Sequence, residues 1–154
     1  MTTPSERLAE LGIALPTVPA PAGSYIPARR SGSLVFTAGQ VPLVDGKPAA
    51  LGKVGAEISA EEASGLAGIC ALNALAAIDA LVGIDAVAGV VKVVGFVASA
   101  PGFTEQPKVI NGASNLLGEI FGDAGRHARS AVGVAELPLG VPVEVELVVE
   151  LAGP

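Results

Sequence analysis

The sequence predicts an α+β domain with a single sheet and two main helices on one of its faces. Two apolar segments have the three-to-four-residue periodicity of helices, and valine-rich segments of strand character flank them. Two further strand-like segments end the chain. A chain of 154 residues fits one domain, residues 1–154, and a domain of this size buries about 68–70% of its unfolded surface.

The composition disfavours several classes of protein. Hydrophobic residues make up 51% of the chain and charged residues 16%, which argues against disorder. The net charge of −6 and the low aromatic content disfavour a nucleic-acid binder, which needs a basic surface. One cysteine and one histidine cannot form an intrachain disulfide or supply a structural zinc site, so we expect no metal. We expect neither a signal peptide nor a membrane span, and therefore a cytoplasmic protein.

The N-terminal part combines a short helix with an irregular segment. The sequence Thr-Pro-Ser-Glu at residues 3–6 has the features of a capping box with proline in the first turn, and we expect a helix within residues 1–15. Residues 16–28 are rich in proline, so we expect extended, irregular chain there. Tyr25, the only tyrosine, lies in this segment, where it either lines a ligand site or covers the core.

A strand, an interruption and a hairpin follow. Residues 33–37 predict a strand that is interrupted at residues 38–40 and continues over residues 41–44. The dipeptide Asp45-Gly46 is typical of a hairpin turn. A glycine in a strand pattern, here Gly39, indicates either a β-bulge or a close approach of the backbone to a ligand.

The main helix is predicted from the Ser59 cap to about Leu81, before Gly83. Its buried stripe comprises Leu66, Ile69, Cys70, Ala74, Ala77, Ile78 and Leu81. We interpret Cys70 as a small core residue, because a catalytic thiolate needs an exposed and electropositive setting.

A long strand and a second helix come next. Residues 87–99 predict a strand with valine on both faces, which indicates burial against a partner. A helix is predicted from Pro107 to Phe121, with Thr104 as its cap. Asn111 and Asn115 lie four residues apart and therefore share one helical face.

Residues 125–150 hold two of the five arginines and the only histidine, and their pattern predicts a hairpin around Pro138-Leu139. With a two-residue turn, facing residues have numbers that sum to 277. This register places on one face the small and charged residues Arg129, Ala131, Gly133, Ala135, Glu144, Glu146 and Glu150, and on the other face Val132, Val134, Val143, Val145, Leu147 and Val149. Such an arginine beside carboxylates forms either an exposed ion-pair ladder or a site for a small anion.

Three motifs in this order resemble the RidA/YjgF family, the reactive intermediate deaminases that are also labelled L-PSP endoribonucleases. They are Gly-Ser-Tyr at residues 23–25, the apolar strand that ends in Ala-Gly-Gln-Val-Pro at residues 38–42, and the C-terminal segment that contains His-Ala-Arg-Ser at residues 127–130 and Glu-Val-Glu at residues 144–146. The resemblance runs from about residue 20 to the C-terminus. The additional N-terminal helix and the motif Gly-Arg-His-Ala-Arg-Ser indicate a longer subgroup.

The resemblance implies a chorismate-mutase-like fold and a homotrimer with sites between subunits. It also implies cofactor-free hydrolysis of 2-imino acids to 2-oxo acids and ammonia. In that reaction Arg129 would bind the substrate carboxylate, for which a planar guanidinium is suited, and Glu144 would position water. The remaining expected substrate-binding residues are Tyr25 and Asn111 as walls, backbone groups at Gly39 and Ala131, and His127 at the rim.

The chain departs from the family pattern where His127 replaces a proline, Ala131 replaces a cysteine and Ala38 replaces a serine. His127 is either an additional acid or base or a hydrogen-bonded structural residue. A non-catalytic binder of small carboxylates would use the same Arg129 pocket. RNA cleavage, which the older family name suggests, is disfavoured by the acidic charge balance, so we expect neither nucleic acid nor membrane as a partner.

Overall fold

Local sequence signals set the ends of the helices in the computed structural model, which describes residues 2–153. Helix α1 (Pro4–Glu10) begins with the predicted capping box, in which Thr3 and Glu6 each accept a hydrogen bond from the backbone N–H of the other. Helix α2 (Ala60–Val82) begins where the Ser59 hydroxyl accepts from the backbone N–H of Glu62, at 3.1 Å, and ends at Gly83, whose φ is 82°. Both helices confirm the sequence-based boundaries.

Helix α3 (Gln106–Phe121) differs from the prediction at its start. Its N-cap residue is Glu105 and not Thr104, and no side chain caps it. The first turn of this helix is instead held by contacts with the segment just before it: the Gln106 amide donates to the Phe103 carbonyl at 2.9 Å and lies 3.1 Å from the Ser99 hydroxyl. The predicted C-terminal end is confirmed, since Gly122 follows the helix with a φ of 61°.

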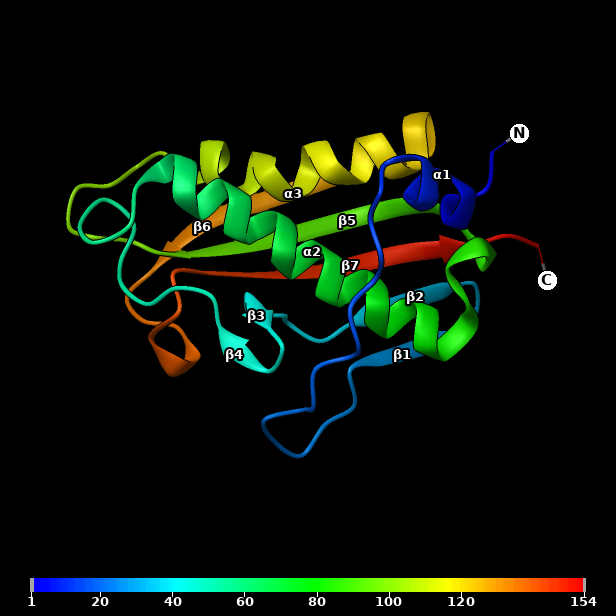
Figure 1. Cartoon of the computed structure of the whole chain (residues 1–154), viewed down its shortest axis with the longest axis horizontal. Helices are drawn as coiled ribbons and strands as arrows, with labels where there is room; N and C mark the ends of the chain where they lie inside the picture. The colour runs from blue at the N-terminus through cyan, green and yellow to red at the C-terminus, as the bar shows by residue number, and fades with distance from the viewer. Residues whose placement is uncertain (1, 154) are drawn as a thin grey trace.

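The two long helices cover one face of a five-stranded sheet, as Figure 1 shows, and the predicted α+β architecture is confirmed. The strand order is β1 (Ala28–Ser31), β2 (Leu34–Thr37), β7 (Val143–Leu151), β5 (Val87–Ala98) and β6 (Ala128–Val134). A separate hairpin joins β3 (Leu43–Val44) to β4 (Lys47–Pro48) through the predicted Asp45-Gly46 turn, in which both residues have positive φ. Strand β1 was not predicted; it lies at an edge of the sheet.

The core lies between the sheet and the helices. Alternate residues of β7 are buried, and α2 packs over β7 and against α3. Cys70 is fully buried in α2 and burial raises the pKa of its thiol, which confirms its interpretation as a core residue. By length and composition α2 could cross a membrane, but 56% of its apolar window is buried within this fold.

The predicted C-terminal hairpin is wrong. Strand β6 pairs with β5 in parallel and β7 pairs with β5 in antiparallel orientation, so β5 separates the two strands. A turn does form at Pro138–Gly140, where Gly140 N donates to Leu137 O at 3.1 Å and Leu139 has a φ of 63°. This turn is a local reversal within the longer connection that carries the chain across the end of β5. Because α3 connects β5 to β6, it imposes the parallel pairing of a strand–helix–strand unit.

The observed register also changes which residues of β6 and β7 lie on the same face of the sheet. Val93 pairs with both Arg129 and Leu147, so Arg129 points toward the helices. Phe96 pairs with both Val132 and Glu144, so Glu144 points to the open face of the sheet. The predicted face that would unite Arg129 and Ala131 with Glu144 and Glu146 does not exist within one chain.

Candidate functional site

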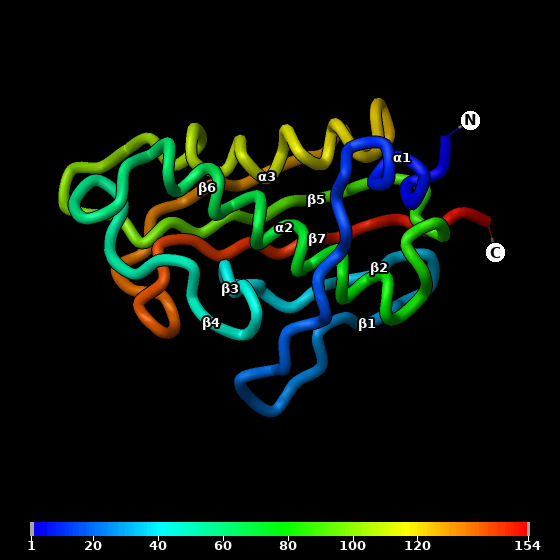
Figure 2. Tube along the Cα trace, in the orientation of Figure 1, coloured from blue at the N-terminus to red at the C-terminus, as the bar shows by residue number. Residues whose placement is uncertain are grey.

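The first group of predicted site residues surrounds a cavity of about 420 Å³ next to β7. Tyr25, Gly39 and Glu144, which are far apart in the sequence, line it together with residues 19–22 and the Pro138-Leu139 turn. Figure 2 shows the blue N-terminal segment passing across α2 and looping out beyond β1 before the chain enters the sheet. This irregular segment therefore supplies one wall of the cavity, and the sheet supplies the other.

The side chain of Glu144 lies directly against Gly39. Gln40 and Val145 exchange two backbone hydrogen bonds, of 2.8 and 3.0 Å, just after β2 ends. A Cβ atom on residue 39 would overlap the Glu144 carboxylate, with the Cδ atom only 2.9 Å away. The group that approaches Gly39 is the side chain of Glu144; contact of the Gly39 backbone with a ligand stays a prediction.

The environment of Glu144 favours its protonated form. Burial raises the pKa of Glu144, and the Glu146 carboxylate on the same face of β7 raises it further. Burial also raises the pKa of Glu146. A carboxylate whose pKa is moved toward neutrality is a better general base than an ordinary surface glutamate.

Tyr25 lies at the wall of the cavity and does not cover the core. Its side chain is about half exposed, at 49%, and its hydroxyl accepts a hydrogen bond from the backbone N–H of Ala22 at 3.1 Å. The phenol therefore closes the irregular loop on itself and presents its ring to the cavity.

The second group lies at the edge strand β6 and the facing side of α3. Arg129 Nη1 donates to Asn111 Oδ1 at 2.8 Å and to Ser114 Oγ at 3.1 Å, while Nη2 donates to Pro107 O at 3.2 Å. These contacts engage three of the five N–H groups of the guanidinium and leave two for a ligand. Of the two asparagines left open by the sequence, it is Asn111 whose side chain meets Arg129.

Sequence reasoning missed Ser114, which joins His127 to Arg129. His127 Nε2 lies 2.9 Å from Ser114 Oγ, and His127 Nδ1 lies 2.6 Å from the carbonyl oxygen of Gly125. A signal was present: Ser114 follows Asn111 by three residues on a helix, and Arg129 follows His127 by two along the strand, so each pair shares a face. Of the alternatives for His127, the structure shows hydrogen bonds at both ring nitrogens.

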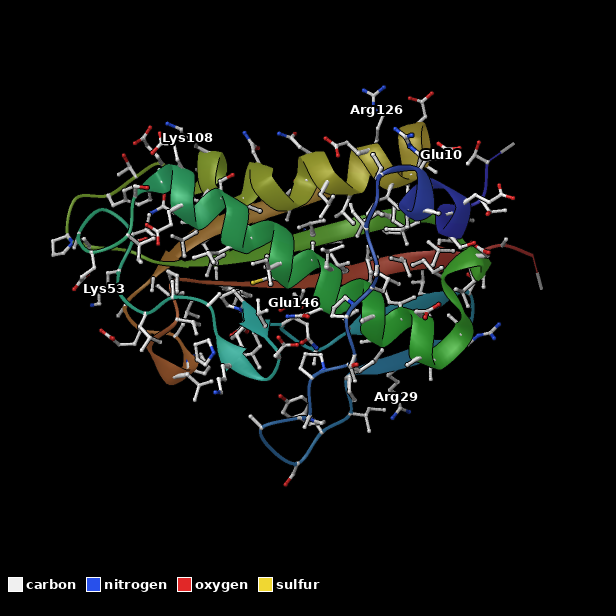
Figure 3. All side chains as sticks on the ribbon, in the orientation of Figure 1. Glu10, Arg29, Lys53, Lys108, Arg126 and Glu146 are labelled. Atoms are coloured by element: carbon white, nitrogen blue, oxygen red, sulfur yellow. The ribbon has the colours of Figure 1, made fainter. Side chains whose placement is uncertain are left out.

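The remaining predicted residues do not complete a single-chain site. Ala131 is partly buried on the helix-facing side of β6, opposite to the face that carries Glu144. Arg126, the other arginine of the motif, points away from the fold above α3, as Figure 3 shows. Within residues 2–153 no three His, Cys, Asp or Glu side chains are grouped so that they could hold a metal ion. The chain thus carries two separate clusters, one with Glu144 and one with Arg129.

Known proteins are similar to this chain in sequence and fold. A family model described as "YjgF/chorismate mutase-like, putative endoribonuclease" matches residues 5–151. Protein TCP17 of Trypanosoma cruzi is 45% identical over 147 residues, which cover 94% of this chain and 92% of the relative. The crystal structure of a putative endoribonuclease from Shewanella oneidensis MR-1 is similar with a TM-score of 0.92 and 35% identity, covering 97% of this chain and 99% of the other.

The fold also resembles that of E. coli TdcF, whose crystal structure contains bound serine. That structure is 26% identical with a TM-score of 0.62, and the match covers 88% of this chain and 94% of TdcF. The family model spans nearly the whole chain, and the solved relatives share its α+β architecture. The chain therefore belongs to the YjgF/chorismate-mutase-like family.

Proposed function

We propose that this protein hydrolyses 2-imino acids to 2-oxo acids and ammonia, at sites formed between two copies of the chain. The proposal rests on one observation: two groups that would act on the same substrate, Arg129 and Glu144, lie on opposite faces of the sheet within one chain. Arg129 offers two free N–H groups beside α3, and Glu144 offers a carboxylate of raised pKa in a cavity at the open face. A substrate with a carboxylate and a neighbouring electrophilic carbon needs both groups at once.

A second copy of the chain would bring the two clusters together. The open face of the sheet carries apolar side chains that are left exposed, with Phe36 44% and Val132 43% accessible. Exposed apolar surface of this kind is typical of an interface between subunits. Arg129 lies on β6, an edge strand, where a neighbouring copy can reach it. The homotrimer that the family resemblance implies would have three such sites, each built from two subunits.

The chemistry requires no cofactor, because the imine carbon is already electrophilic. Arg129 holds the substrate carboxylate through a charge-assisted hydrogen bond. Glu144 takes a proton from water as the water oxygen bonds to the imine carbon, the π electrons of the C=N bond move to nitrogen, and Glu144 passes the proton to that nitrogen. In the resulting carbinolamine the hydroxyl proton is transferred, again through Glu144, to the amino nitrogen. The C–N bond then breaks, ammonia leaves with the electron pair, and the oxygen becomes the carbonyl of the 2-oxo acid.

The bound serine in TdcF supports a ligand of amino-acid size in this family. The endoribonuclease description of the family has less support in this chain, because its net charge of −6 opposes binding to a polyanion. A protein that only bound small carboxylates would still need Arg129 but would have no use for the raised pKa of Glu144.

The proposal is tested by competition for an imine. An amino-acid oxidase generates 2-imino acids from a series of amino acids in the presence of semicarbazide, which traps them. The protein should lower the yield of trapped imine, and Arg129→Ala should abolish this effect. Arg126→Ala is the matched control, since Arg126 is exposed and directed away from the fold, and it should behave as the unaltered protein.

Three outcomes separate the alternatives. Glu144→Gln should lose turnover while still binding a stable 2-oxo acid in calorimetry. If no imine in the series is consumed faster with the protein, the deaminase proposal fails. If a carboxylate nevertheless binds in an Arg129-dependent way, the protein is a binder of small carboxylates.

A further inference from the structure

With a neutral imidazole, the hydrogen bonds around Ser114 and His127 have one consistent direction. The Gly125 carbonyl can only accept, so His127 Nδ1 carries the hydrogen of their 2.6 Å contact. In the neutral ring Nε2 is then an acceptor, so the Ser114 hydroxyl donates to it across 2.9 Å. The Ser114 oxygen in turn accepts from Arg129 Nη1 at 3.1 Å. The four groups form a directed chain from the guanidinium to the backbone.

The backbone end of this chain is fixed by packing. Gly125 is buried against the end of α3, where an added Cβ would lie 2.6 Å from the Leu117 carbonyl oxygen and 3.2 Å from Gly118 Cα. No side chain fits at this position, so the backbone of Gly125 packs directly against the end of α3. Its carbonyl belongs to this packed backbone and accepts the hydrogen bond that orients the imidazole.

His127 also decides where the Ser114 hydroxyl points. A serine inside a helix can donate to the carbonyl four residues earlier, and that carbonyl then sets the direction of its lone pairs. Here the hydroxyl hydrogen is directed to His127, so that a lone pair faces Arg129. Together with Asn111 and the Pro107 carbonyl, this oxygen is one of three acceptors that hold the guanidinium.

We propose that Ser114 and His127 are positioning residues that fix Arg129 in the orientation in which it binds the substrate carboxylate. The proposal rests on the proposed function, which assigns carboxylate binding to Arg129. Neither residue needs to touch the substrate: both act through the guanidinium.

The same order of donors occurs in Ser-His-Asp hydrolases, with a backbone carbonyl here in the place of the aspartate. Two observations favour positioning over nucleophilic attack by Ser114. Its oxygen already accepts a hydrogen bond from a cation, and it lies within α3, outside the cavity that contains Glu144.

The first test is spectroscopic and does not depend on activity. His127 is the only histidine, so the ring-nitrogen NMR spectrum of the labelled protein contains one pair of imidazole signals. We expect the neutral ring to be protonated at Nδ1, and the Nε2 signal to shift in Ser114→Ala. A neutral ring protonated at Nε2 would overturn the proposed direction of the chain.

The second test measures binding and turnover in matched variants. His127→Asn keeps a donor for the Gly125 carbonyl but cannot reach Ser114, and Ser114→Thr keeps the hydroxyl that Ser114→Ala removes. We expect His127→Asn and Ser114→Ala to weaken the binding of 2-oxobutyrate, measured by calorimetry, and to raise KM for the imine, each about tenfold, with kcat changed little. Ser114→Thr should restore most of the affinity.

The outcomes distinguish this proposal from the proposed function. If Arg129→Ala abolishes 2-oxobutyrate binding while both positioning variants bind as the unaltered protein does, the positioning role is overturned and carboxylate binding by Arg129 stands. If 2-oxobutyrate binding survives Arg129→Ala, the assignment of Arg129 fails and the positioning role fails with it. Thermal unfolding of each variant verifies that the comparison is made between folded proteins.

Discussion

Replacing Gly39 with alanine would add one methyl group where the Glu144 carboxylate now lies. The new Cβ would be 2.9 Å from Glu144 Cδ and closer still to one carboxylate oxygen, whereas ordinary contacts of this kind are 3.4–4 Å. The backbone of residue 39 does not have the positive φ that disfavours alanine, and the atoms that must move are at the end of a flexible side chain. The carboxylate should therefore move by about 1 Å or more while the fold persists.

A displacement of about 1 Å in a catalytic group can reduce the rate by about a hundredfold. We therefore expect kcat/KM for imine hydrolysis to fall by about that factor in Gly39→Ala. Stability should change by no more than about 1 kcal/mol, because alanine also restricts the unfolded chain. The imine competition assay measures the first quantity, and thermal unfolding measures the second.

Gly65→Ala in α2 is the matched control, since its Cβ would meet no atom within 4 Å. We expect it to retain full activity and to gain up to about 1 kcal/mol of stability, as is usual for alanine in place of glycine in a helix. Unchanged kcat/KM in Gly39→Ala would refute the reasoning, because it would show that the position of the Glu144 carboxylate does not matter for turnover.

Further predictions concern titration and packing. Because the pKa of Glu144 is raised in the folded state, its stabilising contribution is present below the unfolded value of 4.5 and is lost as the pH rises through the raised value. Glu144→Gln should therefore unfold at a higher temperature than the unaltered protein at pH 7, and this difference should shrink toward pH 4; a constant difference would contradict the assignment. The same raised pKa should place the acid limb of kcat/KM for imine hydrolysis above pH 4.5, and a limb at or below this value would argue against Glu144 as the base. Gly112→Ala should lower the free energy of unfolding by about 1–3 kcal/mol through overpacking, because its Cβ would lie 2.6 Å from the backbone carbon of Ser64. Denaturant titration checks this against Gly118→Ala, whose Cβ has open space.

The features that depend on local sequence were predictable. The Thr3 and Ser59 caps, the end of α2 at Gly83 and the Asp45-Gly46 hairpin are each specified within a few residues. The start of α3 was predicted less well, because its first turn is held by contacts with the preceding loop and with Ser99, and not by a capping side chain.

The order of the strands could not be deduced in this way. Alternation shows which residues of one strand share a face, but it does not show which strand lies alongside. The pattern of residues 128–150 fitted a hairpin, yet β5 takes the place between β6 and β7. Because of this single error, Arg129 and Glu144 were expected on the same face although they lie on opposite faces of the sheet.

The sequence therefore predicted which residues belong to the candidate site, but it did not predict how they are arranged. Tyr25, Gly39 and Glu144 do meet at one cavity, and Asn111 does meet Arg129. Ser114 was missed because its spacing from Asn111 places both on one helical face but does not show which strand that face packs against. Its role becomes visible only when α3 packs beside β6 and the hydroxyl lies between His127 and Arg129.

Mixing two inactive variants tests the central claim, that Arg129 of one copy and Glu144 of another form one imine-hydrolysing site. Arg129→Ala and Glu144→Gln subunits, carrying different tags, are unfolded together and reassembled, and the mixed oligomers are isolated by both tags. A mixed trimer holds two subunits of one variant and one of the other, so about one of its three sites combines an intact Arg129 with an intact Glu144. We expect imine hydrolysis to return in the mixed oligomers to roughly this fraction while each variant alone stays inactive. Mixed oligomers that remain inactive would contradict it.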